Sequence, residues 1–220
     1  MRALVIGASG GIGSAVAVAL VQRRWEVVGL SRRADGLDVT DEASVARVLG
    51  AVEGVFDLIF VATGGLEIAG ARPEKSVKAL DGAAMAAQFA LNAIGPALVI
   101  KHVWRLIPKD RPAKVAVLSA RVGSIGDNRL GGWHGYRAAK AALNQIVRTC
   151  AVELARTHPA AALVALHPGT VATGLTAAYA GGHPTVTPAV AAENLLTVLE
   201  GIGPGETGGF FDWQGERVEW

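Results

Sequence analysis

Tyr136 and Lys140 are the two side chains of this sequence whose types and spacing best suit proton transfer. They stand four positions apart, so a helix opening at Tyr136 would place both on one face, one turn apart. A lysine cation there stabilises the phenolate and lowers the tyrosine pKa towards the working range of a proton donor. The alternative is a half-buried tyrosine beside a solvated lysine.

A glycine-rich turn, Gly7-Ala8-Ser9-Gly10-Gly11-Ile12-Gly13, stands near the start of the chain. Glycines permit a tight turn and let the backbone approach a pyrophosphate closely, and a following helix offers free N–H groups to the phosphates. An ordinary glycine-rich turn is the alternative. Because it separates a predicted first strand from a predicted first helix, the turn predicts a dinucleotide site made by Gly7, Ser9, Gly10, Gly11, Ile12 and Gly13.

These residues need a framework of strands and helices to position them. Apolar runs predict strands at 3–6, 27–30, 56–62, 115–118, 163–166 and 209–213. Helical patterns cover 12–24, 44–52, 83–107, 136–157 and 189–199, with a kink expected near Gly95-Pro96. The alternation predicts an α/β fold, a Rossmann-type doubly wound parallel sheet in three layers. No repeat or linker divides the chain, so one domain over residues 1–220 is expected.

The Tyr-x-x-x-Lys pair and the Gly-x-x-x-Gly-x-Gly spacing resemble the short-chain dehydrogenase/reductase family. The loop 121–133 and the closing segment 211–220 look like its C-factor-like branch. The resemblance implies that Tyr136 exchanges a proton with the substrate oxygen. It also implies that Lys140 holds the nicotinamide ribose of the cofactor and tunes Tyr136.

Further matches span nearly the whole chain. Asn92 resembles the family's Asn-x-x-Gly asparagine, which supports a proton relay through water; a residue stabilising the helix bend is the alternative. The segment 168–173 resembles one that contacts the nicotinamide half, and Asp38-Val39 one that touches the adenine. At 61–64 the family's Asn-Asn-Ala-Gly is replaced by Val-Ala-Thr-Gly, which keeps only the glycine that holds the backbone close to the cofactor. A simple turn and a surface aspartate are the competing interpretations. The implied cofactor contacts are Asp38, Val39, Ala62, Thr63, Gly64, Tyr136, Lys140, Pro168, Gly169, Val171 and Thr173.

The sequence departs from the family pattern at the residue expected to hydrogen-bond the substrate carbonyl. Ala120 occupies the place of the catalytic serine, and a methyl group cannot donate a hydrogen bond. Loss of one such donor typically costs about 10²–10³ in rate. Ser119 points to the opposite side of an extended chain from its neighbour, so Ser124, in the following loop, is the preferred substitute.

A second departure concerns the connection after the second strand. Ser31-Arg32-Arg33 passes almost at once to Asp38-Val39, and a parallel crossover needs about a dozen residues or more. The helix between the family's second and third strands is therefore shortened or missing, and its third strand is vestigial or that sheet edge is irregular.

Ser31, Arg32 and Arg33 also bear on which nicotinamide cofactor binds. They stand where an acid would bind the ribose 2′-hydroxyl, and two guanidiniums favour a 2′-phosphate instead. We therefore expect NADP(H) to be preferred, with NAD(H) still possible. A solvated basic turn is the alternative.

Composition narrows the remaining classes. With 21 basic and 19 acidic residues and no basic stripe, nucleic-acid binding is not expected, and no metal site is predicted. Cys150 is the single cysteine, so no internal disulfide can form. The apolar start is too short for a secretory signal, and Lys101 and Arg105 are expected to interrupt the longest apolar run, which predicts a cytoplasmic protein away from membranes. The apolar stretch 83–91 lacks the polar face of a surface helix. The family resemblance implies that this helix and the one opening at Tyr136 pair across a two-fold axis, so a homodimer or homotetramer is expected; a helix buried within the monomer is the alternative.

The leading functional hypothesis is an NADP(H)-dependent oxidoreductase that reduces a small carbonyl compound, or oxidises the alcohol, with Tyr136 as acid/base and Lys140, Asn92 and Ser124 assisting. Ala120 motivates the alternative, a cofactor-binding signalling or scaffold protein with weak or no catalysis. A nucleotide-sugar epimerase or dehydratase is disfavoured because the chain leaves little room for a second substrate domain.

Overall fold

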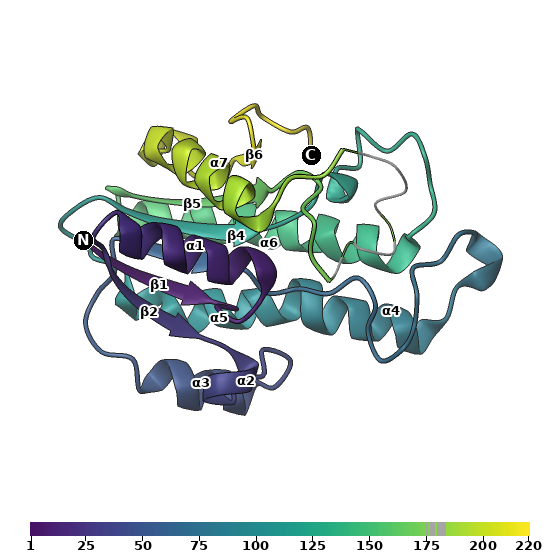
Figure 1. The fold of residues 1–220 in the computed structure, drawn as a ribbon, viewed down its shortest axis with the longest axis horizontal. Helices are drawn as coiled ribbons and strands as arrows, with labels where there is room; N and C mark the ends of the chain where they lie inside the picture. Colours follow the sequence, from purple (N-terminus) through teal and green to yellow (C-terminus); the bar gives the residue numbers. More distant parts are fainter. Residues whose placement is uncertain (175, 177–178, 180–183) are drawn as a thin grey trace.

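The computed structural model describes residues 1–174, 176, 179 and 184–220, and in them a single parallel sheet forms the middle layer (Figure 1). Its strands run in the order β2-β1-β3-β4-β5-β6, and every neighbouring pair is parallel. Their bounds are β1 Arg2–Ile6, β2 Glu26–Leu30, β3 Leu58–Val61, β4 Ala113–Leu118, β5 Ala161–His167 and β6 Phe210–Asp212. All carboxyl ends therefore meet along one edge of the sheet.

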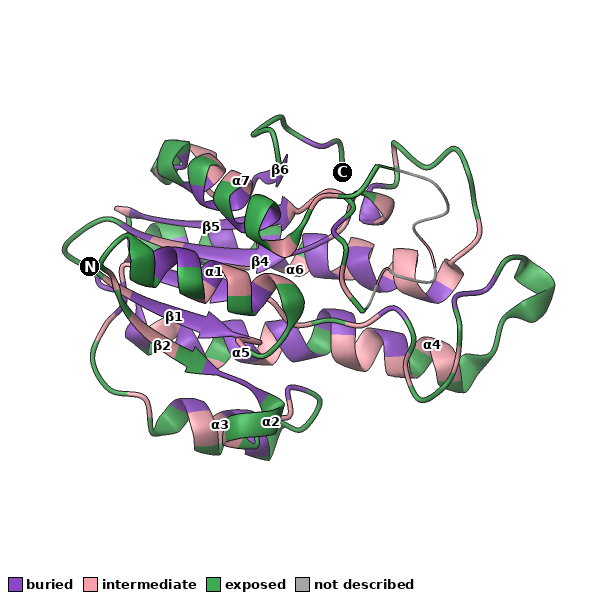
Figure 2. Cartoon of the chain, viewed as in Figure 1, coloured by how far each residue is buried: buried purple, intermediate pink, exposed green. Residues whose placement is uncertain are grey.

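Helices cover both faces of the sheet. One face packs against α1 (Gly11–Gln22) and α7 (Pro188–Gly201), the other against α3 (Glu42–Gly50), α5 (Gly95–Val103) and α6 (His134–Thr157). Figure 2 shows the buried strands between these layers. The inner strands are apolar towards both helix layers, whereas the edge strand β2 is partly exposed, with Glu26 and Gly29 at the surface. The predicted Rossmann-type, doubly wound fold is confirmed.

The shortened connection after β2 is a single helical turn, α2 (Arg32–Asp35). Ser31 caps it by accepting the Ala34 N–H at 3.1 Å, and Gly36 ends it in the left-handed region at φ +65°. Residues 36–40 form no strand but are tied to α3, whose Ser44 hydroxyl accepts the Asp38 N–H and donates to the Gly36 carbonyl. β2 is consequently the edge of the sheet.

The long helical segment is divided where proline requires it. α4 (Gly82–Phe89) is followed by a π-helical turn at Ala90–Ile94 and then by α5, with Pro96 in its first turn. Pro96 has no N–H to donate to the carbonyl of Asn92 four residues earlier, so α-helical bonding cannot run through this point. The expected kink is realised as a local widening of the helix.

The expectation that charges interrupt every long apolar run is wrong for this segment. Gly82–Leu106 is long and apolar enough to cross a membrane by length and composition alone, and Lys101 is its first charged residue. A core helix of a folded domain passes the same test, and 39% of its most apolar window is buried here. Val99, Ile100 and Val103 are buried against the sheet, whereas much of α4 is partly exposed. That the apolar stretch 83–91 mediates self-association stays a prediction.

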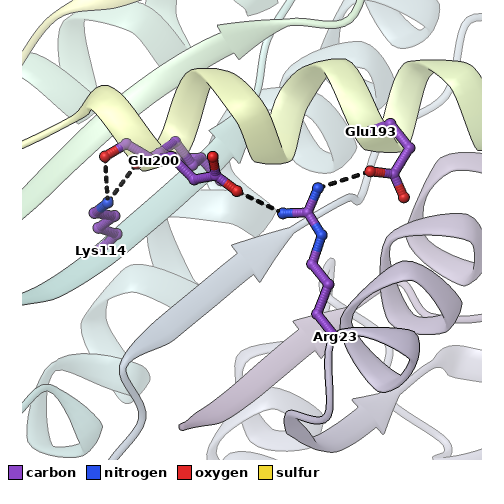
Figure 3. Close-up of polar contacts among 5 residues, drawn as sticks. Arg23, Lys114, Glu193 and Glu200 are labelled. Atoms are coloured by element: carbon purple, nitrogen blue, oxygen red, sulfur yellow. Dashed lines mark hydrogen bonds and ion pairs between the residues drawn. The ribbon is translucent and has the colours of Figure 1, made fainter.

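Polar contacts fasten α1 to α7 at the end remote from the glycine turn (Figure 3). Arg23 reaches Glu193 at 2.7 Å and Glu200 at 2.9 Å, while Lys114 of β4 donates to the Leu199 and Glu200 carbonyls where α7 ends. Partly exposed ion pairs of this kind contribute at most about 1 kcal/mol each. The two ion pairs of Arg23 therefore help to hold the end of α1 against α7, but they contribute little to the free energy of folding. The 3-10 turns Val77–Ala79, Trp104–Leu106, Arg121–Gly123 and Pro204–Glu206 complete the described elements.

Candidate active site

A cavity of about 830 Å³ opens at the carboxyl edge of the sheet. Its walls come from the β1–α1 turn, the ends of β3, β4 and β5, and the first turns of α6. It brings together many of the predicted site residues: Gly10, Gly11, Ile12, Gly13, Ala62, Thr63, Gly64, Tyr136, Lys140, Pro168, Gly169, Val171 and Thr173. Segments distant in the sequence thus meet around a single space.

The glycine turn is set by two close backbone approaches. Gly7 has φ +88°, and a Cβ added to it would lie 2.6 Å from the Ala62 carbonyl oxygen. A Cβ added to Gly13 would lie 2.2 Å from the Gly7 carbonyl oxygen. Gly10 caps α1 without a side-chain bond, so the first N–H groups of the helix point to the cavity edge free of a capping oxygen. This cradle suits an anionic phosphate group.

Tyr136 and Lys140 share one face of α6, as their spacing predicts. The ammonium nitrogen of Lys140 lies 5.8 Å from the centre of the Tyr136 ring and donates to the Leu118 carbonyl at 3.1 Å. Burial lowers the pKa of Lys140 to about 8, because the charged ammonium is removed from water. Burial also raises the pKa of Tyr136 to about 12. The phenol is therefore fully protonated near neutral pH.

The expected lowering of the tyrosine pKa is thus not found in the chain by itself. Burial disfavours the phenolate, and Lys140 makes its hydrogen bond to the backbone of β4 rather than to the phenol oxygen. A protonated phenol remains able to donate a proton to a substrate oxygen. What the chain alone prepares is the acid form of Tyr136.

Ser119, Ala120 and Ser124, the residues after β4 considered for the role of the catalytic serine, differ in whether they reach the cavity. Ser119 and Ala120 both line the cavity, but Ser124 does not: it is buried, and its hydroxyl accepts the Asp127 N–H at 3.1 Å. The Ser119 hydroxyl donates to Asn144 of α6 at 2.6 Å. β4 ends at Leu118, but Ser119 still donates its N–H to the Leu166 carbonyl at 2.8 Å and Ala120 is extended, with φ −146°. Both residues border the cavity at this strand end, so alternation does not exclude Ser119 from its wall.

Asn92 lies outside the cavity wall, in the π-helical turn. Its side-chain amide donates to Gly65 at 2.8 Å and Gln88 at 2.7 Å, and its oxygen accepts the Gly65 N–H at 3.1 Å. The side chain therefore holds the loop after β3 against the long helix. Its part in a proton relay stays a prediction.

The adenine-side candidates surround the end of β2 and do not line the cavity. Arg32 and Arg33 are exposed, whereas Ser31 and Val39 are buried. Asp38 accepts the backbone N–H and the hydroxyl of Thr40, which lower the pKa of its carboxyl. Gly7 and Ser9 belong to the glycine turn without reaching the cavity wall. Cofactor contacts from all these residues stay predictions.

Several cavity residues carried no signal strong enough to single them out from sequence. Trp133 packs edge-to-face against Tyr136 and Tyr179, with ring centres 6.3 and 5.5 Å apart. His167 ends β5, and burial lowers its pKa to about 4, so it is neutral. Its place directly before Pro168 was the available clue. Other such residues are Leu66, Leu118, Arg121, Val122, Leu130, Gly131, Arg137, Thr170, Gly174, Thr176 and Tyr179.

A buried carboxylate fixes the start of α6. Glu74 accepts the Gly135 N–H at 3.2 Å, and its own carbonyl accepts the Trp133 N–H at 2.5 Å. Trp133 stands at the helix start in the left-handed region, φ +51°, without a side-chain cap. Glu74 supplies that cap from a loop some sixty residues earlier. It therefore anchors the turn that carries Tyr136.

Two features of the cavity fit a nicotinamide dinucleotide: the glycine turn and two buried polar atoms without partners among the described residues. Gly10, Gly11 and Gly13 line the cavity without side chains, and the first N–H groups of α1 have no side-chain cap there, which suits the phosphates. The Thr63 hydroxyl and the His167 Nδ1 are buried and have no hydrogen-bond partner among the described residues. Both residues line the cavity, so a bound polar group would satisfy them.

Comparisons with known proteins define the class. The family model for short chain dehydrogenases matches residues 1–181. A 1-hydroxy-2-glutathionyl-2-methyl-3-butene dehydrogenase of Rhodococcus sp. is 32% identical over 99% of this chain and 98% of its own length. The C-signal protein of Myxococcus xanthus is 36% identical over 64% of this chain and 81% of its own. The chain belongs to the short-chain dehydrogenase/reductase family, and it is an oxidoreductase acting on CH–OH or C=O groups.

Solved structures agree on the fold. The carbonyl reductase Sniffer of D. melanogaster superposes with a TM-score of 0.82 at 18% identity, covering 100% of this chain and 99% of that one. An NADPH-bound carbonyl reductase from chicken fatty liver gives 0.79 at 22% identity, covering 100% and 94%. At such identities the likeness concerns the arrangement of strands and helices.

Gly13→Ala should disrupt the cradle, because its methyl group would collide with the Gly7 carbonyl. We expect a loss of about 1–3 kcal/mol in unfolding free energy and at least roughly tenfold weaker NADPH binding. Thermal unfolding and fluorescence titration measure the two. Gly201→Ala is the matched control, since a Cβ there meets nothing within 4 Å. Unchanged stability and NADPH affinity in Gly13→Ala would contradict the assigned role of this turn.

Proposed function

We propose that this protein is an NADP(H)-dependent reductase of small carbonyl compounds, or the corresponding alcohol dehydrogenase, with Tyr136 as its acid/base. One observation carries the proposal: Tyr136 and Lys140 stand on one face of α6 and line the same cavity as the glycine turn. The relative from Rhodococcus sp., a dehydrogenase by name, supports it over nearly the whole length.

The proton chemistry follows from the environments of the two side chains. A bound nicotinamide dinucleotide supplies or accepts the hydride. Tyr136 is protonated at neutral pH because burial disfavours its phenolate, so it gives its proton to the oxygen of the reduced carbonyl. Lys140 is buried and still mostly protonated at pH 7, and its charge stabilises the phenolate that remains.

Stabilisation of the carbonyl oxygen by a serine is weaker than the family pattern implies. Ala120 presents a methyl group at the cavity wall. Ser119 also lines the cavity, but its proton is directed to Asn144. We propose that Tyr136 carries most of the polarisation of the substrate, and that Ser119, which lines the cavity, assists it rather than Ser124, which does not.

Tyr136→Phe should lower kcat for carbonyl reduction by about 10²- to 10⁴-fold, because it removes the proton donor while keeping the ring. NADPH oxidation over a panel of small aldehydes and ketones measures the rate, and titration measures NADPH affinity, which should persist. Tyr179→Phe is the matched control: Tyr179 lines the same cavity, but its hydroxyl bonds to Glu67 at the protein surface. Equal activity of Tyr136→Phe and wild type would contradict the role of Tyr136.

The same panel tests the second candidate, a cofactor-binding signalling or scaffold protein. Ala120 is the observation that favours it, since the usual serine hydroxyl is missing from the cavity wall. NADPH binding by the wild type without turnover of any carbonyl compound would favour this candidate over the reductase.

The pKa of Lys140, about 8, predicts the pH dependence of the reaction. Reduction requires protonated Lys140, so kcat/KM should be constant below this pKa. Above it, kcat/KM should fall about tenfold per pH unit as the pH rises. Initial rates between about pH 6 and pH 10 measure the profile, and any residual activity of Lys140→Met should lack this fall. A wild-type profile that stays flat or rises through pH 8 would contradict the assignment.

The preference for NADP(H) is supported by charge at the end of β2. Arg32 and Arg33 are exposed and make no ion pair with a described acidic residue. The nearby Asp35 carboxylate accepts the Ser31 N–H at 2.7 Å, which engages the acid that could otherwise bind a ribose hydroxyl. Two unpaired guanidiniums favour a 2′-phosphate.

Replacing both Arg32 and Arg33 by alanine should weaken NADPH binding by about 10- to 100-fold, the effect of losing a charge-assisted hydrogen bond. NADH binding should change little, because NADH lacks the phosphate. Fluorescence titrations with both cofactors measure the constants. Arg24→Asn is the control, since Arg24 lies just before the amino end of β2, whereas Arg32 and Arg33 follow its carboxyl end. Equal losses for NADPH and NADH would contradict a phosphate-specific role.

A further inference from the structure

Among the described residues that line the cavity, three carry a cationic side chain and none carries an acidic one. The three cationic residues are Arg121, Arg137 and Lys140. A cavity of low dielectric constant that is lined by positive charges attracts an anion. The three cations differ in whether the protein itself already neutralises them.

Arg121 is neutralised within the protein. Its guanidinium lies 2.6 Å from Asp127 and 3.9 Å from Asp212, and these carboxylates raise its pKa. Lys140 belongs to the proton chemistry described above. The charge of Arg121 is thus paired, and that of Lys140 already has a role in the proposed proton transfer.

Arg137 differs from both of them. Its guanidinium donates only to backbone carbonyls, Gly132 at 3.0 Å and Val122 at 3.3 Å, and its Nη2 has no partner among the described residues. No described carboxylate lies within 4 Å, and residues 175, 177–178 and 180–183 include no Asp or Glu. Partial burial lowers its pKa, since no acid offsets the loss of water.

The position of Arg137 assigns it to the substrate half of the cavity. It follows Tyr136 directly, and its two backbone partners belong to the loops that precede α6. Trp133 and Leu130, from the same loop, give this half an aromatic and apolar wall. The phosphate cradle belongs to a different element, the β1–α1 turn at Gly10–Gly13.

We propose that Arg137 binds a carboxylate on the substrate, so that the natural substrates are carbonyl or hydroxyl compounds bearing a carboxylate beside an apolar group. This inference rests on the proposed function, because it assigns the substrate class of that same site. The guanidinium has a fixed fork of donors that matches a planar carboxylate, and its two backbone bonds hold that fork in place.

The test compares phenylglyoxylate, which carries a carboxylate, with its neutral methyl ester, using NADPH as the reductant. In Arg137→Met, kcat/KM for the acid should fall by about 10- to 100-fold, while that for the ester changes less than about threefold. Arg137→Lys, which keeps the charge without the fork, should lie between wild type and Arg137→Met. Arg129→Met is the matched control, since Arg129 is exposed and does not line the cavity.

The acid-to-ester ratio separates recognition from damage to the fold, because a disturbed loop would reduce both reactions together. An unchanged ratio in Arg137→Met would overturn the inference. A weaker NADPH affinity in Arg137→Met than in Arg129→Met would also overturn it, because it would assign the guanidinium to the cofactor.

Calorimetric titration with benzoate, which cannot be reduced, separates the inference from the proposed function. Benzoate should bind the NADP⁺-loaded wild type and bind Arg137→Met at least about tenfold more weakly. No turnover of either carbonyl compound, together with Arg137-dependent benzoate binding, would contradict the reductase function and support the anion site. Reduction of the ester without benzoate binding would support the function and overturn the inference.

Discussion

The close contact between the β1–α1 turn and the backbone at the end of β3 is the constraint on which the rest depends. Gly7 approaches the Ala62 carbonyl, and Gly13 approaches the Gly7 carbonyl, at distances that exclude any Cβ. The contact brings α1 down onto the sheet and aims its first turn at the carboxyl edge. The cavity forms because every parallel strand ends along that edge. The packing of two glycines thus helps to position the cavity at the carboxyl edge of the sheet.

Burial sets the protonation states of the two titratable side chains on α6 that line the cavity. Lys140 is 3% exposed and has no acidic partner among the described residues, so burial lowers its pKa to about 8. Tyr136 is kept in its acid form for the same reason. Such groups disfavour folding, and the surrounding structure offsets them. Here Glu74 caps the helix that carries both groups, and Asn92 holds the loop opposite.

The sheet edge beside β2 shows how a family fold loses an element without losing its core. Leu37 and Val39 remain buried although no strand forms at 36–40. Their side chains continue the core beneath α3, and Ser44 bonds the backbone that a neighbouring strand would have satisfied. Short hydrogen-bonded turns therefore replace a strand and its crossover helix.

The sequence by itself determined what depends on local spacing. The 3.6-residue period put Tyr136 and Lys140 on one face, the alternation of strands and helices predicted the Rossmann-type sheet, and Pro96 predicted the break in the long helix. Only the tertiary structure decided which polar groups share the cavity. It placed Ser119 and not Ser124 at the wall, left Arg137 without an acid, and capped α6 with Glu74. Those facts depend on contacts between segments far apart in the chain, and periodicity carries no information about such contacts.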